Sequence, residues 1–268
     1  MKLKVLVDNN TYIDHYYYGE PALSYYIEDG DKKILFDAGY SDIFIKNAEA
    51  FGIDFNEISD IVFSHGHDDH SRGLKYLFEQ FKIPHVRVTA HPNAFNEKVV
   101  DGKPYGCPLN EKQVREHANL FLSNEPVKIS DNIFFLGEVP ASNDFEKRKQ
   151  FGQERRNGVF VDDFVLDDSA IVYKGERGLF VITGCSHSGI CNIIEYSKKV
   201  CNEDRITGVI GGFHLFDVDM QLEKTIEYFI KNNIRKLYPC HCVSFKVKAE
   251  IHKYIPVHEV GVGMELDL

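Results

Sequence analysis

Three histidines and two aspartates fall within six consecutive positions of the stretch SHGHDDHSRG, residues 64–73. Imidazole and carboxylate groups are costly to bury without partners, and both are common ligands of divalent metal ions. His65 and His67 are two residues apart, so both imidazoles point the same way if the turn is extended. Asp69 and His70 would then come from the first turn of a following helix. The spacing predicts two adjacent metal ions, one on each of these pairs.

Further residues of the same chemical types follow the ends of other predicted strands. They are Asp37 after KKILF, His91 after VRVTA, Cys185 and His187 after LFVIT, His214 after TGVIGG, and His241 after KLYPC. In open α/β sheets, ligands bind outside the carboxyl ends of the strands, so we expect these side chains to share one site. Each ion needs four or more ligands. His187 is expected to complete the first ion and His241 the second.

Two divalent ions held close together can share a hydroxide and hold both oxygens of a displacement reaction. A bound ion lowers the pKa of its water to roughly 7, so the nucleophile forms at neutral pH. Asp69, His91 and His214 are the candidate catalytic residues for proton transfer. For His91 and His214, a partly exposed structural histidine is an equally good interpretation. The other histidines are expected to be ordinary polar residues: His15, His85, His117, His252 and His258.

The elements that must position these residues alternate as in an α/β protein, with short β-branched runs between amphipathic stretches. Strands are expected at 3–7, 23–28, 33–36, 60–63, 86–90, 133–136, 169–173, 179–183, 207–210, 236–238 and 257–262. Helices are expected at 43–51, 69–81, 111–122, 189–201, 220–232 and 245–254. In the helix at 69–81, Leu74, Leu77, Phe78 and Phe81 form one apolar stripe, which predicts packing against a sheet.

The segment at about 92–168 differs from its surroundings, because it is polar and has few predicted strands. We expect a single domain, 1–268, in which this segment is an insertion over the site. Five of its basic residues lie close together: Lys147, Arg148, Lys149, Arg155 and Arg156. Guanidinium groups suit phosphate oxygens, so Arg148, Arg155 and Arg156 are candidate substrate-binding residues. The alternative is a solvated helix face on which Glu146 and Glu154 pair with these cations.

Composition excludes some classes of protein. The chain has 268 residues, 43% of them hydrophobic and 27% charged, and a formal net charge of −10. This acidic balance argues against nucleic acid as a partner, which normally requires a basic surface. We expect no membrane span and no signal peptide. The six cysteines are then expected to be reduced thiols of a cytoplasmic protein, and nothing in the sequence sets the oligomeric state.

The motif SHGHDDH resembles the His-x-His-x-Asp-His signature of the metallo-β-lactamase superfamily. LFDAG is similar to the first motif of that family, and VITGCSH and YPCHC stand where its later motifs belong. The resemblance implies an α/β fold, the four-layer αββα sandwich, with a dinuclear metal site between the edges of its two sheets. It also implies that Asp37 contacts a ligand rather than a metal ion. The ions would be zinc, with iron and manganese as alternatives.

The sequence departs from the family pattern at Cys185. The fourth motif usually offers an Asp after Gly that bridges both ions, whereas Cys185 stands in that place here. Either Cys185 is a thiolate ligand, or His187 is the ligand and the ions share only solvent. We favour His187, with Cys185 as a buried, inert thiol beside the site. We expect the cysteines on either side of His241 to pack against the strands.

A narrower resemblance is carried by ILFDAG, AHPNAF, GEVP followed by FE, TGCSHSGI, GGFHL and PCHC. Together they resemble the subgroup that contains the archaeal dihydropterin–ribofuranosylaminobenzene phosphate synthase. Two enzymatic functions follow as hypotheses. The first is a metal-dependent hydrolase that acts on a phosphoester or another anionic small molecule. The second is a pterin-type transferase that displaces diphosphate in methanopterin-like biosynthesis. A redox protein and a pure binding module fit less well, because no flavin domain is evident and the ligand set is complete.

Overall fold

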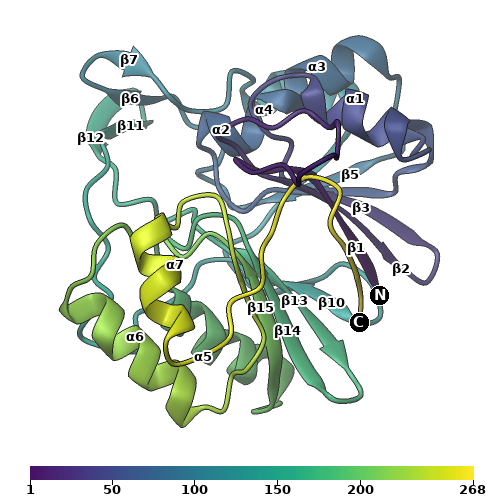
Figure 1. Ribbon diagram of the computed structural model, residues 1–268. Coiled ribbons are helices and arrows are strands. Elements are labelled where there is room, and N and C mark those ends of the chain that lie inside the picture. The colour runs from purple at the N-terminus through teal and green to yellow at the C-terminus, as the bar shows by residue number, and fades with distance from the viewer.

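The computed structural model describes residues 1–268 as two large β-sheets packed face to face, with helices on both outer faces (Figure 1). The first sheet has the strand order β17 (Glu265–Asp267), β1 (Lys2–Val7), β2 (Ser24–Asp29), β3 (Lys32–Phe36), β4 (Asp60–Val62), β5 (Arg87–Ala90) and β8 (Asn119–Leu122). The second has the order β16 (Leu237–Pro239), β15 (Ile206–Gly211), β14 (Gly178–Thr183), β13 (Ala170–Gly175), β10 (Ile133–Phe135) and β9 (Val127–Lys128).

The helices form the two outer layers. Those beside the first sheet are α1 (Ile43–Ala50), α3 (Gly73–Gln80) and α4 (Glu111–His117), with α2 (Asp68–Ser71) and the 3-10 turn Phe55–Glu57 between strands. Those beside the second sheet are α5 (Ile190–Cys201), α6 (Met220–Lys231) and α7 (Phe245–His252). A smaller sheet stands apart from both (Figure 1), in the order β12 (Val159–Asp162), β11 (Gln153–Arg156), β6 (Lys98–Val100) and β7 (Lys103–Pro104).

Three apolar cores lie between these layers. One lies between the first sheet and its helices and includes Phe44, Leu77 and Val114. A second lies between the other sheet and α5 to α7, and the third fills the space between the two sheets. Each helix therefore buries one apolar face, which is the arrangement that amphipathic sequences stabilise. The αββα sandwich expected from the sequence is confirmed.

The two sheets bring their parallel strands to one site. Strands β3, β4, β5 and β8 are parallel neighbours in the first sheet, as are β14, β15 and β16 in the second. Neighbouring parallel strands have their carboxyl ends at the same edge of a sheet, and most of the candidate ligands directly follow such ends. The topology therefore brings residues that are far apart in the sequence together in one cluster.

The structure differs from the sequence expectations at several places. The expected helix 111–122 ends at His117, and residues 119–122 form β8, which gains a parallel ladder beside β5. The expected strand 257–262 makes only isolated bridges at Val257 and Val262. The segment 92–168 is richer in strands than expected and divided: β6, β7, β11 and β12 make the small sheet, whereas β8, β9 and β10 belong to the main sheets. No helix combines the length and the apolar character that crossing a membrane requires.

Candidate metal centre

The motif SHGHDDH forms a tight turn between β4 and α2. Gly66 is required there, because a Cβ atom at this position would lie 2.0 Å from the carbonyl oxygen of Ala94. The small sheet holds the same turn from outside: the Asp68 N–H donates to Tyr105 O at 2.8 Å, and the Cys107 N–H donates to Gly66 O at 2.8 Å. The turn is thus fixed by backbone contacts on both sides, which limits the movement of the imidazoles it carries.

Four residues of the site have a left-handed backbone conformation that non-glycine residues rarely adopt. Their φ angles are 55° for Asp37, 62° for Ser186, 50° for His214 and 51° for His241. Such conformations cost free energy and persist only where the surrounding structure imposes them, most often at functional sites. Each of these residues lies just beyond a strand end.

The expected ligands of the first ion lie together. The ring centroid of His65 is 4.4 Å from that of His67 and 5.0 Å from that of His187, and the latter two are 4.8 Å apart. The Nε2 atoms of all three are buried and have no hydrogen-bond partner in the protein. Buried polar atoms without partners are costly and therefore rare. Three such nitrogens in one place fit a divalent ion that accepts their lone pairs.

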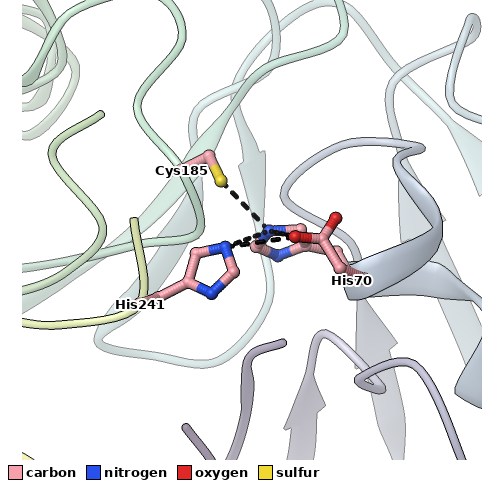
Figure 2. A group of neighbouring side chains, drawn as sticks. His70, Cys185 and His241 are labelled. Atoms are coloured by element: carbon pink, nitrogen blue, oxygen red, sulfur yellow. Dashed lines mark hydrogen bonds and ion pairs between the residues drawn. The ribbon is translucent and has the colours of Figure 1, made fainter. Parts of the chain in front are cut away.

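The expected ligands of the second ion form a neighbouring group. His241 Nε2 lies 3.2 Å from His70 Nε2 and 3.2 Å from Asp69 Oδ2. Figure 2 shows His70 and His241 directed toward the same point, with Cys185 beside them. Asp69, His70 and His241 thus lie close together, as do His65 and His187 with the ring of His67 beside them. The assignment of one ion to each set stays a prediction.

Cys185 belongs to both groups. Its Sγ lies 3.2 Å from His70 Nε2. The ligand atoms of Asp69, His70, Cys185 and His241 all lie within 4.8 Å of one another, as do those of His65, Cys185 and His187. This shared position is where a bridging ligand would stand, which is what the thiolate alternative requires. Burial, in contrast, raises the pKa of the Cys185 thiol well above its usual value, which is what the inert-thiol alternative expects.

Asp37 lies behind the imidazoles and is fully buried. Its Oδ2 accepts hydrogen bonds from His70 Nδ1 and Ser64 Oγ, and its Oδ1 accepts one from the Ser64 N–H, all at 2.7 Å. Ser64 Oγ in turn lies 2.9 Å from His65 Nδ1. The Asp37 carboxylate therefore fixes the ring of one candidate ligand directly and that of another through Ser64, in the manner of metal sites generally.

The electrostatics divide the histidines into two kinds. Burial lowers the pKa of His65 and His67 well below the usual value, and it lowers the pKa of His187 to about 3. These rings are neutral near pH 7, which is the form that binds metal. Burial also opposes charge on His70, but the carboxylates of Asp69 and Asp37 outweigh it and raise its pKa to about 9. A metal ion at His70 would take the place of that proton.

A cavity of about 550 Å³ opens onto these groups. His67, Asp69, Cys185, His187 and His241 form its floor, together with His214. Four aromatic side chains also line it: Tyr40, Tyr105, Phe151 and Phe216. The volume suits a small molecule, and the combination of apolar walls with a few convergent polar groups is typical of ligand sites. A separate hollow near the chain termini has no histidine or cysteine in its lining.

The other sequence-predicted residues have different positions. His214 lines the cavity, with its ring centroid 4.2 Å from that of His187. His91 does not line it; its Nε2 lies 3.4 Å from Glu138 Oε2. The three candidate arginines also lie outside the lining. Arg148 donates to the carbonyls of Val139 and Val165, Arg155 pairs with Glu97, and Arg156 pairs with Glu154.

The sequence analysis missed several carboxylates that hold the site. Asp8 follows β1 and accepts a hydrogen bond from the His241 N–H at 3.0 Å. Asp167 accepts one from the Gly66 N–H at 2.8 Å and pairs with the buried Lys98 at 3.0 Å. Asp168 accepts one from the Ser188 N–H at 2.8 Å, next to His187. The paired aspartates of LDDSA ahead of a strand, and Asp8 at a strand end, were the available signals.

This chain is similar to known proteins in both sequence and fold. Residues 17–200 match the family model of the metallo-β-lactamase superfamily. An uncharacterized protein of Methanocaldococcus jannaschii is 38% identical over 259 residues, which cover 93% of each chain. The 7,8-dihydropterin-6-methyl-4-(β-D-ribofuranosyl)-aminobenzene-5′-phosphate synthase of the same organism is 30% identical over 92% of this chain and 89% of its own.

A solved structure described as a metal-dependent hydrolase of the β-lactamase superfamily superposes with a TM-score of 0.84 at 31% identity. The match covers 100% of this chain and 99% of the other. The family model covers more than half of the chain. The sandwich fold is the one that the resemblance of the motif SHGHDDH implied. On this evidence the chain belongs to the metallo-β-lactamase superfamily.

Proposed function

We propose that the protein is a metal-dependent hydrolase that acts on a phosphoester or another anionic small molecule at a dinuclear site. The observation that carries the proposal is the set of buried, unpartnered Nε2 atoms of His65, His67 and His187 beside a second group of ligand atoms. Divalent ions bound there, with zinc as the first candidate, would supply Lewis acidity and lower the pKa of a water molecule. This chemistry is what hydrolysis at neutral pH requires.

The protein's own residues have separate roles in this proposal. Asp37 and Ser64 hold the imidazoles of His70 and His65 in position. His214 lines the cavity beside His187, and burial lowers its pKa to about 4, so its ring is neutral near pH 7. A neutral ring can accept a proton from an attacking group or orient it by a hydrogen bond. His214 is therefore our candidate for the proton-transfer residue, and Asp69 is a candidate ligand.

A transferase that displaces diphosphate from a pterin-type substrate is the second candidate function. Two observations favour it. A relative that is 30% identical over nearly the whole chain carries the name of a dihydropterin-linked phosphate synthase. In addition, the aromatic side chains of Tyr40, Tyr105, Phe151 and Phe216 line the cavity, and such rings stack well against planar heterocycles. In this reaction an amine, rather than water, would attack the carbon that bears the leaving group.

Metal analysis followed by a substrate screen tests both functions. Elemental analysis of the reconstituted protein should give two ions per chain, and less than one would contradict the metal site. The loaded protein is then assayed with phosphoesters, lactones and pterin diphosphates, with and without an arylamine. Release of diphosphate that requires the amine would favour the transferase, whereas amine-independent cleavage would favour the hydrolase. His67→Ala should abolish either activity in a folded protein, because this side chain belongs to no apolar core.

A further inference from the structure

A small hollow of about 40 Å³ adjoins the main cavity and shares three of its lining residues, Phe151, His187 and His214. Because the same side chains line both, the two spaces lie next to each other beside His187 and His214. The far wall of the hollow carries Lys147 and Lys149. The hollow is therefore a positively charged extension of the site. Neither metal binding nor proton transfer by His214 requires these lysines.

Lys147 and Lys149 have no partner within the protein. Neither takes part in an ion pair or a hydrogen bond, although the chain carries a formal net charge of −10. Arg148 lies between them in the sequence and is used differently, since its guanidinium donates to main-chain carbonyls. Two adjacent but unpaired ammonium groups at the wall of a hollow raise the local positive potential, which favours an anionic ligand.

Glu146 is the one carboxylate in the wall, and its charge is already engaged. Its two carboxylate oxygens accept hydrogen bonds from the Cys191 N–H and the Asn192 N–H at 2.9 Å, and from Asn143 Nδ2 at 2.8 Å. The carboxylate thus caps the first turn of α5, whose N-cap Gly189 has no side chain to do so. This cap ties the segment that carries both lysines to the start of α5, beside the hollow.

We propose that Lys147 and Lys149 bind a second phosphate or phosphonate group of the substrate, distinct from the group that the metal ions would hold. The proposal rests on the proposed function for the position of the reacting group. It assigns the substrate to molecules with two anionic groups, one beside the candidate metal ligands and one beside the hollow. Ammonium groups suit this role because they bind phosphate as point charges and tolerate variation in its orientation.

The test compares the affinities of two series of probes for the metal-loaded, full-length protein by isothermal titration calorimetry. One series is alkyl monophosphonates, and the other is terminal bisphosphonates with propylene and longer linkers. The wild-type protein should bind the best bisphosphonate roughly tenfold more tightly than the matching monophosphonate. In the Lys147→Ala/Lys149→Ala variant this ratio should fall to about one, while the affinity for monophosphonates should stay unchanged.

The matched control is the variant Lys82→Ala/Lys112→Ala. It removes two exposed lysines that also lack partners but lie outside both cavities, so it changes the net charge equally. The control should keep the wild-type ratio. A ratio that is the same in all three proteins would overturn the proposal, as would an equal loss in both variants. The measurement needs no turnover, so a metal-loaded protein that cleaves no phosphoester would contradict the proposed function and still give this ratio.

Discussion

Replacement of Asp37 is the most informative perturbation of the site, because this carboxylate contacts its ligands from behind. Its oxygens accept three hydrogen bonds, from the Ser64 N–H, from Ser64 Oγ and from His70 Nδ1. In Asp37→Ala the hydroxyl of Ser64 can rotate toward another acceptor, but the two N–H donors remain buried. Leaving a buried donor without a partner costs about 1–3 kcal/mol. The metal-free variant should therefore lose about 2–6 kcal/mol of unfolding free energy.

Metal affinity should fall as well. Loss of the acceptor behind a metal-bound histidine typically weakens metal binding about 10–100-fold, which equals roughly 1.4–2.8 kcal/mol. Asp37→Asn retains one acceptor oxygen and most of the shape, so it should keep more of the stability. The amide nitrogen cannot accept a hydrogen bond, so with the oxygen facing the Ser64 N–H the variant loses the acceptor for His70 Nδ1 and should show a similar loss of affinity.

The assay is competition for Zn²⁺ with a chromophoric chelator, alongside denaturant unfolding of the metal-free proteins. Asp60→Asn is the matched control. Asp60 is also fully buried and has two polar partners, Lys32 and Arg87, but it lies at the beginning of β4, away from the site. This control should lose stability and keep its metal affinity. If Asp37→Ala binds Zn²⁺ as tightly as the wild-type protein does, the reasoning on ligand positioning is refuted.

Three further predictions concern the surroundings of the site. Cobalt-loaded protein should show a near-ultraviolet thiolate charge-transfer band that Cys185→Ser removes; a band that survives the substitution, or no band in the wild-type protein, would exclude Cys185 as a ligand. Burial alone would raise the pKa of Asp167, but the charge of Lys98 above all holds this pKa below its usual value. The ionised carboxylate therefore stabilises the folded state above about pH 4, and this contribution decreases as the pH falls. Asp167→Asn should accordingly flatten the acid branch of the unfolding free energy of metal-free protein, and an unchanged slope would refute this role. In Gly184→Ala the new Cβ would lie 2.1 Å from Ser64 Oγ. We therefore expect the unfolding free energy measured with denaturant to fall by about 1–3 kcal/mol and Zn²⁺ binding to weaken. Wild-type values for both quantities would show that the turn can relax.

Local sequence determined the elements and the residue types of the site. The apolar stripe at Leu74, Leu77 and Phe78 predicted a buried helix face, and apolar runs with several β-branched residues predicted the buried strands β14 and β15. The spacing within SHGHDDH was enough to place His65 and His67 together, because side-chain direction over a few residues depends on local backbone geometry alone. The order of strand ends likewise indicated which distant residues would meet.

Only the tertiary structure decided which side chain fills each place. Pairing of Glu154 with a neighbouring cation was one of the sequence alternatives, and Arg156 makes that pair on strand β11 rather than on a helix. The sequence could not show that Arg155 pairs with Glu97 or that Lys147 and Lys149 line the hollow, since these contacts join segments that are remote along the chain. Nor could it show that Cys185 stands between both ligand groups. Strand pairing fixes such positions through contacts between remote segments, whereas residue type and spacing report only on a side chain's own neighbourhood. The local sequence therefore determined which chemical groups are available at the site, and the packing of the two sheets determined how these groups are arranged.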